Sequence, residues 1–119
     1  DIQRKVNYSY GALGEKAVPS IPFLTEKLEA EEVLVRATAA GALGQIGPAA
    51  GKAGSSLLLL LNDTSYWVRL NAALSLGKIY AHSKDENIIE ALEMLLNDEN
   101  GGVRMHAGRA IKSIQGDPE

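Results

Sequence analysis

Cysteine is absent from the 119 residues of this chain, which excludes disulfide frameworks, thiolate zinc sites and cysteine nucleophiles. A basic excess is also missing: the formal net charge is −3 at pH 7, which argues against a general nucleic-acid binder. The longest uninterrupted apolar run, from Leu57 to Leu61, is far short of the roughly 20 residues that a bilayer requires. Without a membrane segment or a signal peptide the sequence favours the cytoplasm, although the missing cysteines leave the compartment undecided.

The composition that remains is that of a globular protein, with 45% apolar and 23% charged residues. The chain opens with Asp1 and no initiator Met, apparently inside a helical pattern. We therefore expect it to be a piece of a longer protein.

The sequence repeats itself. Residues 35–46, 68–79 and 103–114 align without gaps: each segment begins Val-Arg, has Ala at the fifth place, Leu or Ile at the ninth and Ile at the twelfth. A pair of leucines stands eleven and seven residues before each Val, at Leu24/Leu28, Leu57/Leu61 and Leu92/Leu96. A weaker copy lies near residues 11–14. The Val-Arg pairs stand 33 and 35 residues apart, and self-similarity at such a spacing is typical of a repeat architecture.

Both repeated segments have a helical period, because their apolar places recur at i, i+4, i+8 and i+11. Turn and N-cap residues separate them at 62–65 and 97–100, and Gly47-Pro48 and Gly116 end the helices before them. Pro19 and Pro22 suit the first turn of a helix that starts near residue 18. We predict an all-α chain with helices at about 2–15, 18–29, 32–46, 50–61, 65–80, 86–97 and 101–115.

Glycines recur inside these predicted helices, where each costs up to about 1 kcal/mol relative to Ala. Their recurrence in register favours close backbone approach between neighbouring helices over mere tolerance of glycine. The residues concerned are Gly11, Gly14, Gly41, Gly44, Gly77 and Gly108. The helix containing Leu57 to Leu61 is apolar on all sides, which is consistent with burial on two sides or with a dimer contact.

A two-helix unit with an Asp in the turn and Val-Arg opening the second helix resembles the HEAT repeat, most closely the short bacterial and archaeal type first described in phycobilisome bilin lyases. The resemblance implies a right-handed α-α superhelix, an armadillo-type solenoid of about 3.5 helix pairs. It covers essentially the whole chain as one repeat domain, with units at about 1–15 (partial), 18–46, 50–80 and 86–115.

The resemblance also implies that the repeated Asp and Arg residues form turn caps and a ladder between units. The matching residues are Arg36, Asp63, Arg69, Asp98 and Arg104. A copy in each unit favours a structural role over a catalytic one, because an active site needs a single constellation. The first unit has Glu29-Ala30 where the others have Asn-Asp, which predicts a weaker cap there.

Residues for catalysis are scarce. His82 and His106 lie far apart, no His-Glu pair occurs, and no glycine-rich phosphate loop is present. One enzyme family with HEAT-like repeats, the deoxyhypusine hydroxylases, holds iron on His-Glu pairs that this chain lacks. We therefore expect no enzymatic activity, no cofactor and no metal site.

In HEAT-type stacks the second helices line the concave surface, and the places between the core positions face outward from it. These places put Trp67, Leu70, Asn71 and Leu74 on one helix and Met105, His106 and Arg109 on the next, beside the small residues Ala37 and Gly41. Such a ridge is consistent with a groove for a helix or extended peptide, and equally with residues covered by a neighbour or by missing sequence.

The sequence thus predicts a scaffold or adaptor that binds another protein or peptide, with self-association or further repeats also open, and no membrane. A bilin-lyase-like subunit that assists chromophore attachment is the alternative that the resemblance supplies. A nucleic-acid contact through Lys78, Arg109 and Lys112 is the weaker third hypothesis, since the net charge is negative.

Overall fold

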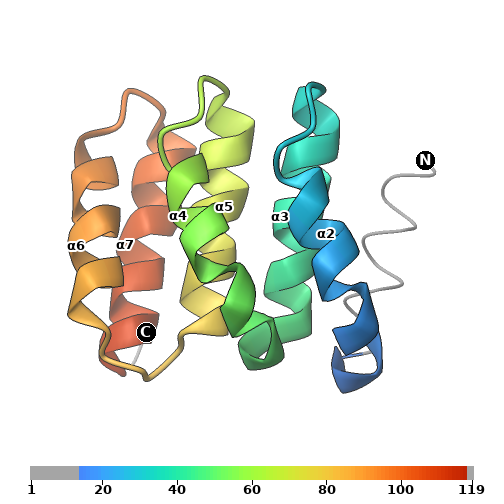
Figure 1. The fold of residues 1–119 in the computed structure, drawn as a ribbon. Coiled ribbons are helices and arrows are strands. Elements are labelled where there is room, and N and C mark those ends of the chain that lie inside the picture. Colours follow the sequence, from blue (N-terminus) through green and yellow to red (C-terminus); the bar gives the residue numbers. More distant parts are fainter. Residues whose placement is uncertain (1–13, 118–119) are drawn as a thin grey trace.

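A computed structural model describes residues 14–117, and every regular element in that range is a helix (Figure 1). The α-helices are α2 (Ile21–Lys27), α3 (Val33–Ile46), α4 (Gly54–Leu60), α5 (Tyr66–Ile79), α6 (Glu86–Glu93) and α7 (Gly101–Gln115). Three 3-10 helices, η1 (Gly14–Ser20), η2 (Gly47–Ala53) and η3 (Met94–Asn97), flank the shorter of them. The predicted all-α class is confirmed, while the helix expected at about 2–15 lies almost wholly outside the described residues.

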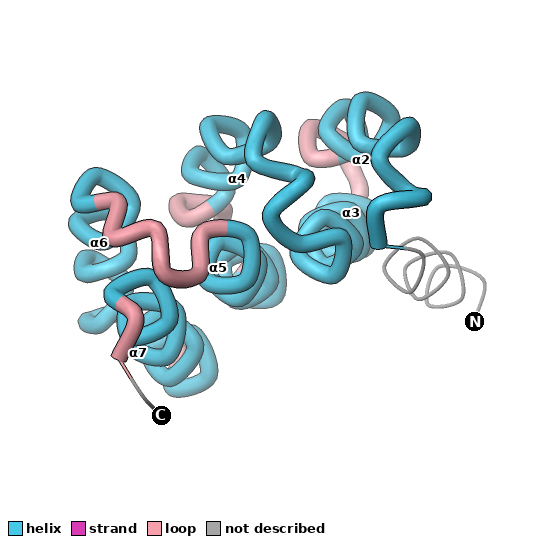
Figure 2. The backbone as a smooth tube through the Cα atoms, turned by 90° about the horizontal axis from the view of Figure 1, so that it is seen from below, coloured by secondary structure: helices cyan, strands magenta, loops and turns pink. Residues whose placement is uncertain are grey.

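The helices form three antiparallel pairs, α2/α3, α4/α5 and α6/α7, stacked side by side (Figure 1). Seen along the helix axes, α2, α4 and α6 make one layer and α3, α5 and α7 the other (Figure 2). The second helices pack directly on one another, α3 on α5 and α5 on α7, whereas each first helix packs mainly on its own partner. This arrangement is the α solenoid that the repeat predicted. We call the side of α3, α5 and α7 that is turned away from the first helices the inner face.

The core is built from the repeated apolar places. On α5 these are Val68, Ala72, Leu76 and Ile79, all buried, and the equivalent residues of α7 are buried as well. Their spacing places them on one side of each helix, toward the first helices and the neighbouring pairs. Small residues between these places, such as Ala73 and Ser75, are buried as well, and the exposed places that remain belong to the inner face.

Two of the recurring glycines allow the second helices to approach closely. A Cβ on Gly77 would lie 2.9 Å from the Cα of Ala110 on α7, and one on Gly44 would lie 2.8 Å from the Cα of Ser75 on α5. Neither position has room for a side chain without moving a backbone. At Gly108 a Cβ would meet only Leu96 Cδ2, at an ordinary 3.8 Å, so close approach explains part of the glycine pattern and not all of it.

The first helices are less regular than the sequence suggested. The helix expected at 18–29 begins as η1 and becomes α-helical only at Ile21, and the one expected at 50–61 begins as η2. Pro22 lies in the first turn of α2, where its missing N–H group costs least. Pro19 lies near the end of η1, so the expectation that it would occupy a first turn is wrong. The third first helix ends at Glu93 and continues as η3.

The leucine run of α4 is buried on one side only. Leu57, Leu60 and Leu61 belong to the core, whereas the side chain of Leu59 is 75% exposed. Burial of this helix on two sides is therefore wrong.

The long connection between α5 and α6 is attached to the end of α7. The amide of His82 donates to the carbonyl of Ser113 over 2.8 Å, and the amide of Lys84 donates to the carbonyl of Ile114 over 2.8 Å. Both residues adopt positive φ angles, 64° and 58°, to make these bonds. The extra length of this loop thus supplies donors to the last carbonyls of α7, of which Ser113 also accepts from the amide of Gly116.

Candidate partner-binding face

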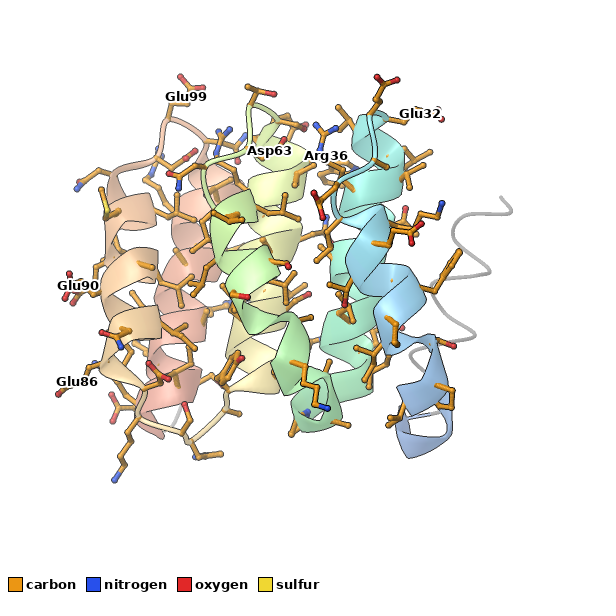
Figure 3. All side chains as sticks on the ribbon, viewed as in Figure 1. Glu32, Arg36, Asp63, Glu86, Glu90 and Glu99 are labelled. Atoms are coloured by element: carbon orange, nitrogen blue, oxygen red, sulfur yellow. The ribbon has the colours of Figure 1, made fainter. Side chains whose placement is uncertain are left out.

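One ion pair joins the first two helix pairs at the end where the turns lie. The guanidinium of Arg36 on α3 donates through Nε to Asp63 Oδ1 over 3.0 Å and through Nη2 to Asp63 Oδ2 over 3.2 Å. Figure 3 shows the two side chains facing each other between neighbouring pairs. Arg36 Nη1 also donates to the carbonyl of Ala30, the residue that stands where later units have Asp. Arg36 thus hydrogen-bonds to the turn of its own helix pair and, through Asp63, to the turn of the next pair.

The second ion pair repeats this geometry one unit later. Arg69 Nε and Nη2 donate to Asp98 Oδ1 and Oδ2 over 2.8 and 3.1 Å, while Nη1 donates to the carbonyl of Asp63 over 2.8 Å. The two side chains are only 10% and 9% exposed. The hydrogen bonds from Arg69 hold the pKa of the Asp98 carboxyl below its usual value, although burial acts in the opposite direction.

The same carboxylates also cap the turns. Asp63 Oδ2 accepts from the amide of Ser65 over 3.0 Å, and Asp98 Oδ2 accepts from the amide of Asn100 over 2.9 Å. Ser65 and Asn100 are the N-caps of α5 and α7, whereas the N-cap of α3, Glu32, makes no side-chain capping bond. The first turn is therefore the least capped, as the Glu29-Ala30 departure suggested.

Arg104 occupies the third ladder position, at the start of α7. Its Nη1 donates to the carbonyl of Asp98 over 2.6 Å, as Arg69 does to its own turn. Within residues 14–117 no carboxylate lies at ion-pair distance from it. Arg104 therefore hydrogen-bonds to the turn that precedes α7, and it forms no ion pair with another helix pair of the described chain.

On the inner face, α5 begins with an exposed aromatic pair. The rings of Tyr66 and Trp67 meet edge to face with their centroids 6.0 Å apart, and the Trp67 side chain is 48% exposed. The Ser65 hydroxyl accepts a hydrogen bond from the Trp67 amide over 3.2 Å, which fixes the start of the helix. Sequence reasoning singled out Trp67 and missed Tyr66, which lies just before the repeated Val-Arg pattern.

The next residues along α5 are less free than the sequence suggested. Leu70 is half-buried and packs against the core. A Cβ built on Gly102 of α7 would lie 3.1 Å from Leu70 Cδ1, so Leu70 contacts the start of α7. Leu74 is also half-buried. The Asn71 amide donates back to the carbonyl of Trp67 over 2.9 Å, so this nitrogen is already engaged.

From α7 the inner face receives Met105, His106 and Arg109. Met105 is 48% exposed and Arg109 is exposed, whereas His106 is half-buried. On α3, Ala37 is buried, so of the two small residues expected to leave a hollow only Gly41 retains partial exposure. Of the predicted contact residues, those of α5 and α7 therefore expose more surface than those of α3.

A cavity of about 200 Å³ lies on the inner face between α5 and α7. Three of the residues expected to bind a partner line it, together with four that the ridge did not include. The lining residues are Leu74, Gly77, Lys78, His106, Arg109, Ala110 and Ser113. Because Gly77 and Ala110 have little or no side chain, the two backbones form the floor and the longer side chains form the walls.

The family model for HEAT repeats matches residues 54–119 of this chain. The chain belongs to the HEAT-repeat family. Among solved structures it is similar to an engineered protein determined by the Northeast Structural Genomics Consortium (target OR329), with a TM-score of 0.74 and 23% sequence identity. That match covers 96% of this chain and 56% of the engineered one, so this chain spans little more than half of its length. No curated protein sequence matches the chain at a significant level.

HEAT repeats generally act as scaffolds for protein interaction, and solenoids of this type are typically not enzymes. Within residues 14–117 no three His, Cys, Asp or Glu side chains come together in a way that could hold a metal ion. None of the helices in that range has both the length and the apolar character needed to cross a membrane.

Proposed function

We propose that this HEAT-repeat chain is a scaffold or adaptor that binds a partner protein or peptide on its inner face. The contact surface consists of Trp67, Leu70, Asn71, Leu74, Met105, His106 and Arg109. Binding would follow from shape and burial, because stacked helices present these side chains in fixed positions and little ordering is needed in the receptor.

The observation that carries the proposal is the exposure of two large side chains on neighbouring second helices, Trp67 on α5 and Met105 on α7. Each of these large side chains leaves 48% of its surface in solvent. Leu74, farther along α5, borders the cavity between the two helices. Tryptophan is enriched among the residues that dominate binding energy, especially next to a pocket that a partner can fill.

The outer layer also exposes apolar side chains, but in a different setting. Leu59 on α4 is 75% exposed and Met94 after α6 is 76% exposed, each on a separate first helix. Around Met94 the chain carries Glu90 and Glu93, both exposed, and neither apolar residue lines the cavity between α5 and α7. Isolated exposed apolar residues are normal on protein surfaces. They therefore serve better as controls than as a second site.

The test is a capture from a lysate of the source organism with three baits: the wild-type chain, Trp67→Ala/Met105→Ala, and Leu59→Ala/Met94→Ala. All four residues are substantially exposed, so helical circular dichroism should be retained by each bait. We expect a protein held by the wild type and by the outer-layer variant, and lost by the inner-face variant. Equal capture by all three baits, or loss only with the outer-layer variant, would refute the proposal.

The bilin-lyase-like alternative rests on the resemblance alone, and no feature of the inner face favours a chromophore. One observation supports the nucleic-acid hypothesis: Lys78 and Arg109 both line the cavity. Two cations are few for a phosphate backbone, where specific binders commonly make about 6–10 phosphate contacts. The same two side chains suit a smaller ligand better.

A further inference from the structure

The charges of this chain are segregated between its two layers. Helices α3, α5 and α7 contain no Asp or Glu, and all of their charged residues are Lys or Arg. Among the side chains that the structure describes, the acidic ones lie on the first helices, in the connections between helices and after α7, as Glu86, Glu90 and Glu99 illustrate in Figure 3. The inner face is therefore electropositive although the chain as a whole carries a net charge of −3.

Only part of this positive charge is available to a ligand. Arg36 and Arg69 are engaged by carboxylates in the ladder. Lys78 and Arg109 are exposed, make no ion pair with any residue of the described range, and meet at the cavity between α5 and α7. Two cations from neighbouring helices thus converge on one concave site, without a carboxylate among its lining residues.

His106 adds a polar group that lacks a partner. Its Nδ1 is shielded from solvent and makes no hydrogen bond within the described part of the chain. A buried polar atom without a partner is rare and costs free energy, so a ligand that bonds to the imidazole would be favoured. By contrast, the Ser113 hydroxyl already donates to the carbonyl of Gly77 over 2.9 Å, which leaves it only its acceptor side.

We propose that this cavity binds an oxyanion, a carboxylate or a phosphoryl group, carried by the partner segment that docks on the inner face. Lys78 and Arg109 donate charge-assisted hydrogen bonds to it, and the imidazole of His106 donates one more. This inference rests on the proposed function and adds the chemistry of the partner: an anionic group next to an apolar one.

The spacing of the two features defines the partner segment further. Trp67 precedes Leu74, which borders the cavity, by seven residues, or about 10 Å along the helix. An extended peptide covers that distance in about three residues, and a helix in about seven. The partner is therefore expected to carry its acidic or phosphorylated residue three positions from an apolar one if extended, and seven if helical.

The apolar neighbourhood favours a protein over a nucleic acid as the source of the anion. Trp67, Leu70 and Met105 lie on the same two helices as the cavity, toward their N-terminal ends, and Lys112 does not line the cavity. A nucleic-acid surface would extend the basic residues along the backbone path instead.

The test uses inorganic phosphate and acetate as probes, with the ring signals of the two histidines followed by NMR. His106 reports on the cavity, and His82, in the loop after α5 and outside the cavity lining, is the internal control. Burial, and then the charge of Arg109, hold the pKa of His106 below its ordinary value. The cavity also brings Lys78 to the same side, so a bound anion should raise the pKa of His106.

We expect saturable chemical-shift changes of the His106 ring signals with at least one probe. Comparing the response to phosphate with the response to acetate shows which of the two oxyanions the cavity prefers. Lys78→Met/Arg109→Met should weaken binding about tenfold or more, since two charge-assisted bonds are lost. Parallel shifts of His82 and His106, or equal binding by the variant, would overturn the inference. So would a DNA duplex that shifts His106 at far lower phosphate concentration than either probe, which would assign the site to nucleic acid.

The cavity variant also joins the capture experiment, which separates the two proposals. If Trp67→Ala/Met105→Ala loses the partner and Lys78→Met/Arg109→Met holds it fully, the inner face binds a partner and the anion inference falls. If both lose it, both proposals are supported. If no bait loses it, the proposed function fails, and the phosphate titration still decides whether the cavity binds an anion.

Discussion

Replacing Asp98 by Asn tests whether the ladder holds the repeats together. Asp98 accepts three hydrogen bonds, two from Arg69 at 2.8 and 3.1 Å and one from the amide of Asn100 at 2.9 Å. An Asn side chain has nearly the same shape but a single acceptor oxygen. Its NH₂ group must face a donor of Arg69 or of Asn100, so at least one bond is lost and the negative charge disappears.

The expected cost lies between two limits. Breaking a buried ion pair by removing one partner costs about 3–5 kcal/mol, whereas an exposed pair contributes about 0.2–1 kcal/mol. With side chains only 10% and 9% exposed, Arg69 and Asp98 are near the buried limit. Because Asn keeps one acceptor, we expect a loss of about 2–3 kcal/mol in the free energy of unfolding at pH 7. For a chain of this length that corresponds to roughly 10 °C in Tm.

The pH dependence gives this prediction its sign. Arg69 holds the pKa of the folded-state Asp98 carboxyl below its ordinary value of 3.8. The ion pair therefore stabilises the fold fully above about pH 5, and its contribution is lost as the pH falls through the folded-state pKa. Urea unfolding followed by circular dichroism should show a constant gap between wild type and Asp98→Asn near neutrality, and a narrowing gap in acid.

The matched control removes a different carboxylate beside the same arginine. Glu99 Oε1 lies 3.9 Å from Arg69 Nη2, but the Glu99 side chain is 92% exposed. Glu99→Gln makes the same change in net charge and should leave stability almost unaltered. Equal effects of the two substitutions, or an Asp98→Asn gap that persists at low pH, would show that general charge or local packing, and not the ladder bond, is responsible.

Two further predictions concern the packing of the second helices and the η2 turn. Gly77→Ala should lower the free energy of unfolding in urea by about 1–2 kcal/mol despite the better helix propensity of Ala, because α5 and α7 must separate. Gly108→Ala, where a Cβ has ordinary space, should leave this free energy unchanged or raise it. A larger loss for Gly108→Ala than for Gly77→Ala would contradict close approach of the helices. The Tyr80 hydroxyl donates to the carbonyl of Gly51 over 2.7 Å, and burial, then the charge of Asp85, raise the pKa of Tyr80. Its stabilising effect should therefore be complete below pH 10 and decline as the pH rises through the folded-state pKa; Tyr80→Phe should cost about 1 kcal/mol at pH 7 and show a smaller alkaline loss, and identical alkaline profiles would refute the assignment.

The helices and their pairing could be predicted from the sequence because each unit repeats the same apolar period and the same turn residues. The 3-10 segments at Gly14–Ser20 and Gly47–Ala53 could not, because prolines and glycines there mark a boundary without stating which hydrogen-bond pattern replaces the α-helix. The conformation of the loop at 80–85 could not be predicted for a related reason. Two of its amides donate to carbonyls of α7, some thirty residues away in sequence, and no local pattern encodes that contact.

The candidate site was only half visible in the sequence. The helical period predicted that Trp67, Met105 and Arg109 lie on the same face. It could not predict that Leu70 contacts Gly102 at the start of α7. The cavity arises from the closeness of two backbones at Gly77, and a count along one helix carries no information on the distance to the next.

The repeats themselves indicate where function resides in this chain. At the places that build the fold the units agree: Val is the third residue of each second helix, Arg follows it, and small or apolar residues recur through the core. At the seventh place, on the inner face, they differ, with Gly41, Leu74 and Arg109 in succession. The fold imposes nearly the same packing demand on each unit, so it cannot by itself require these differences. Side chains that vary between equivalent places, and that converge on one cavity, are the ones that a partner would select.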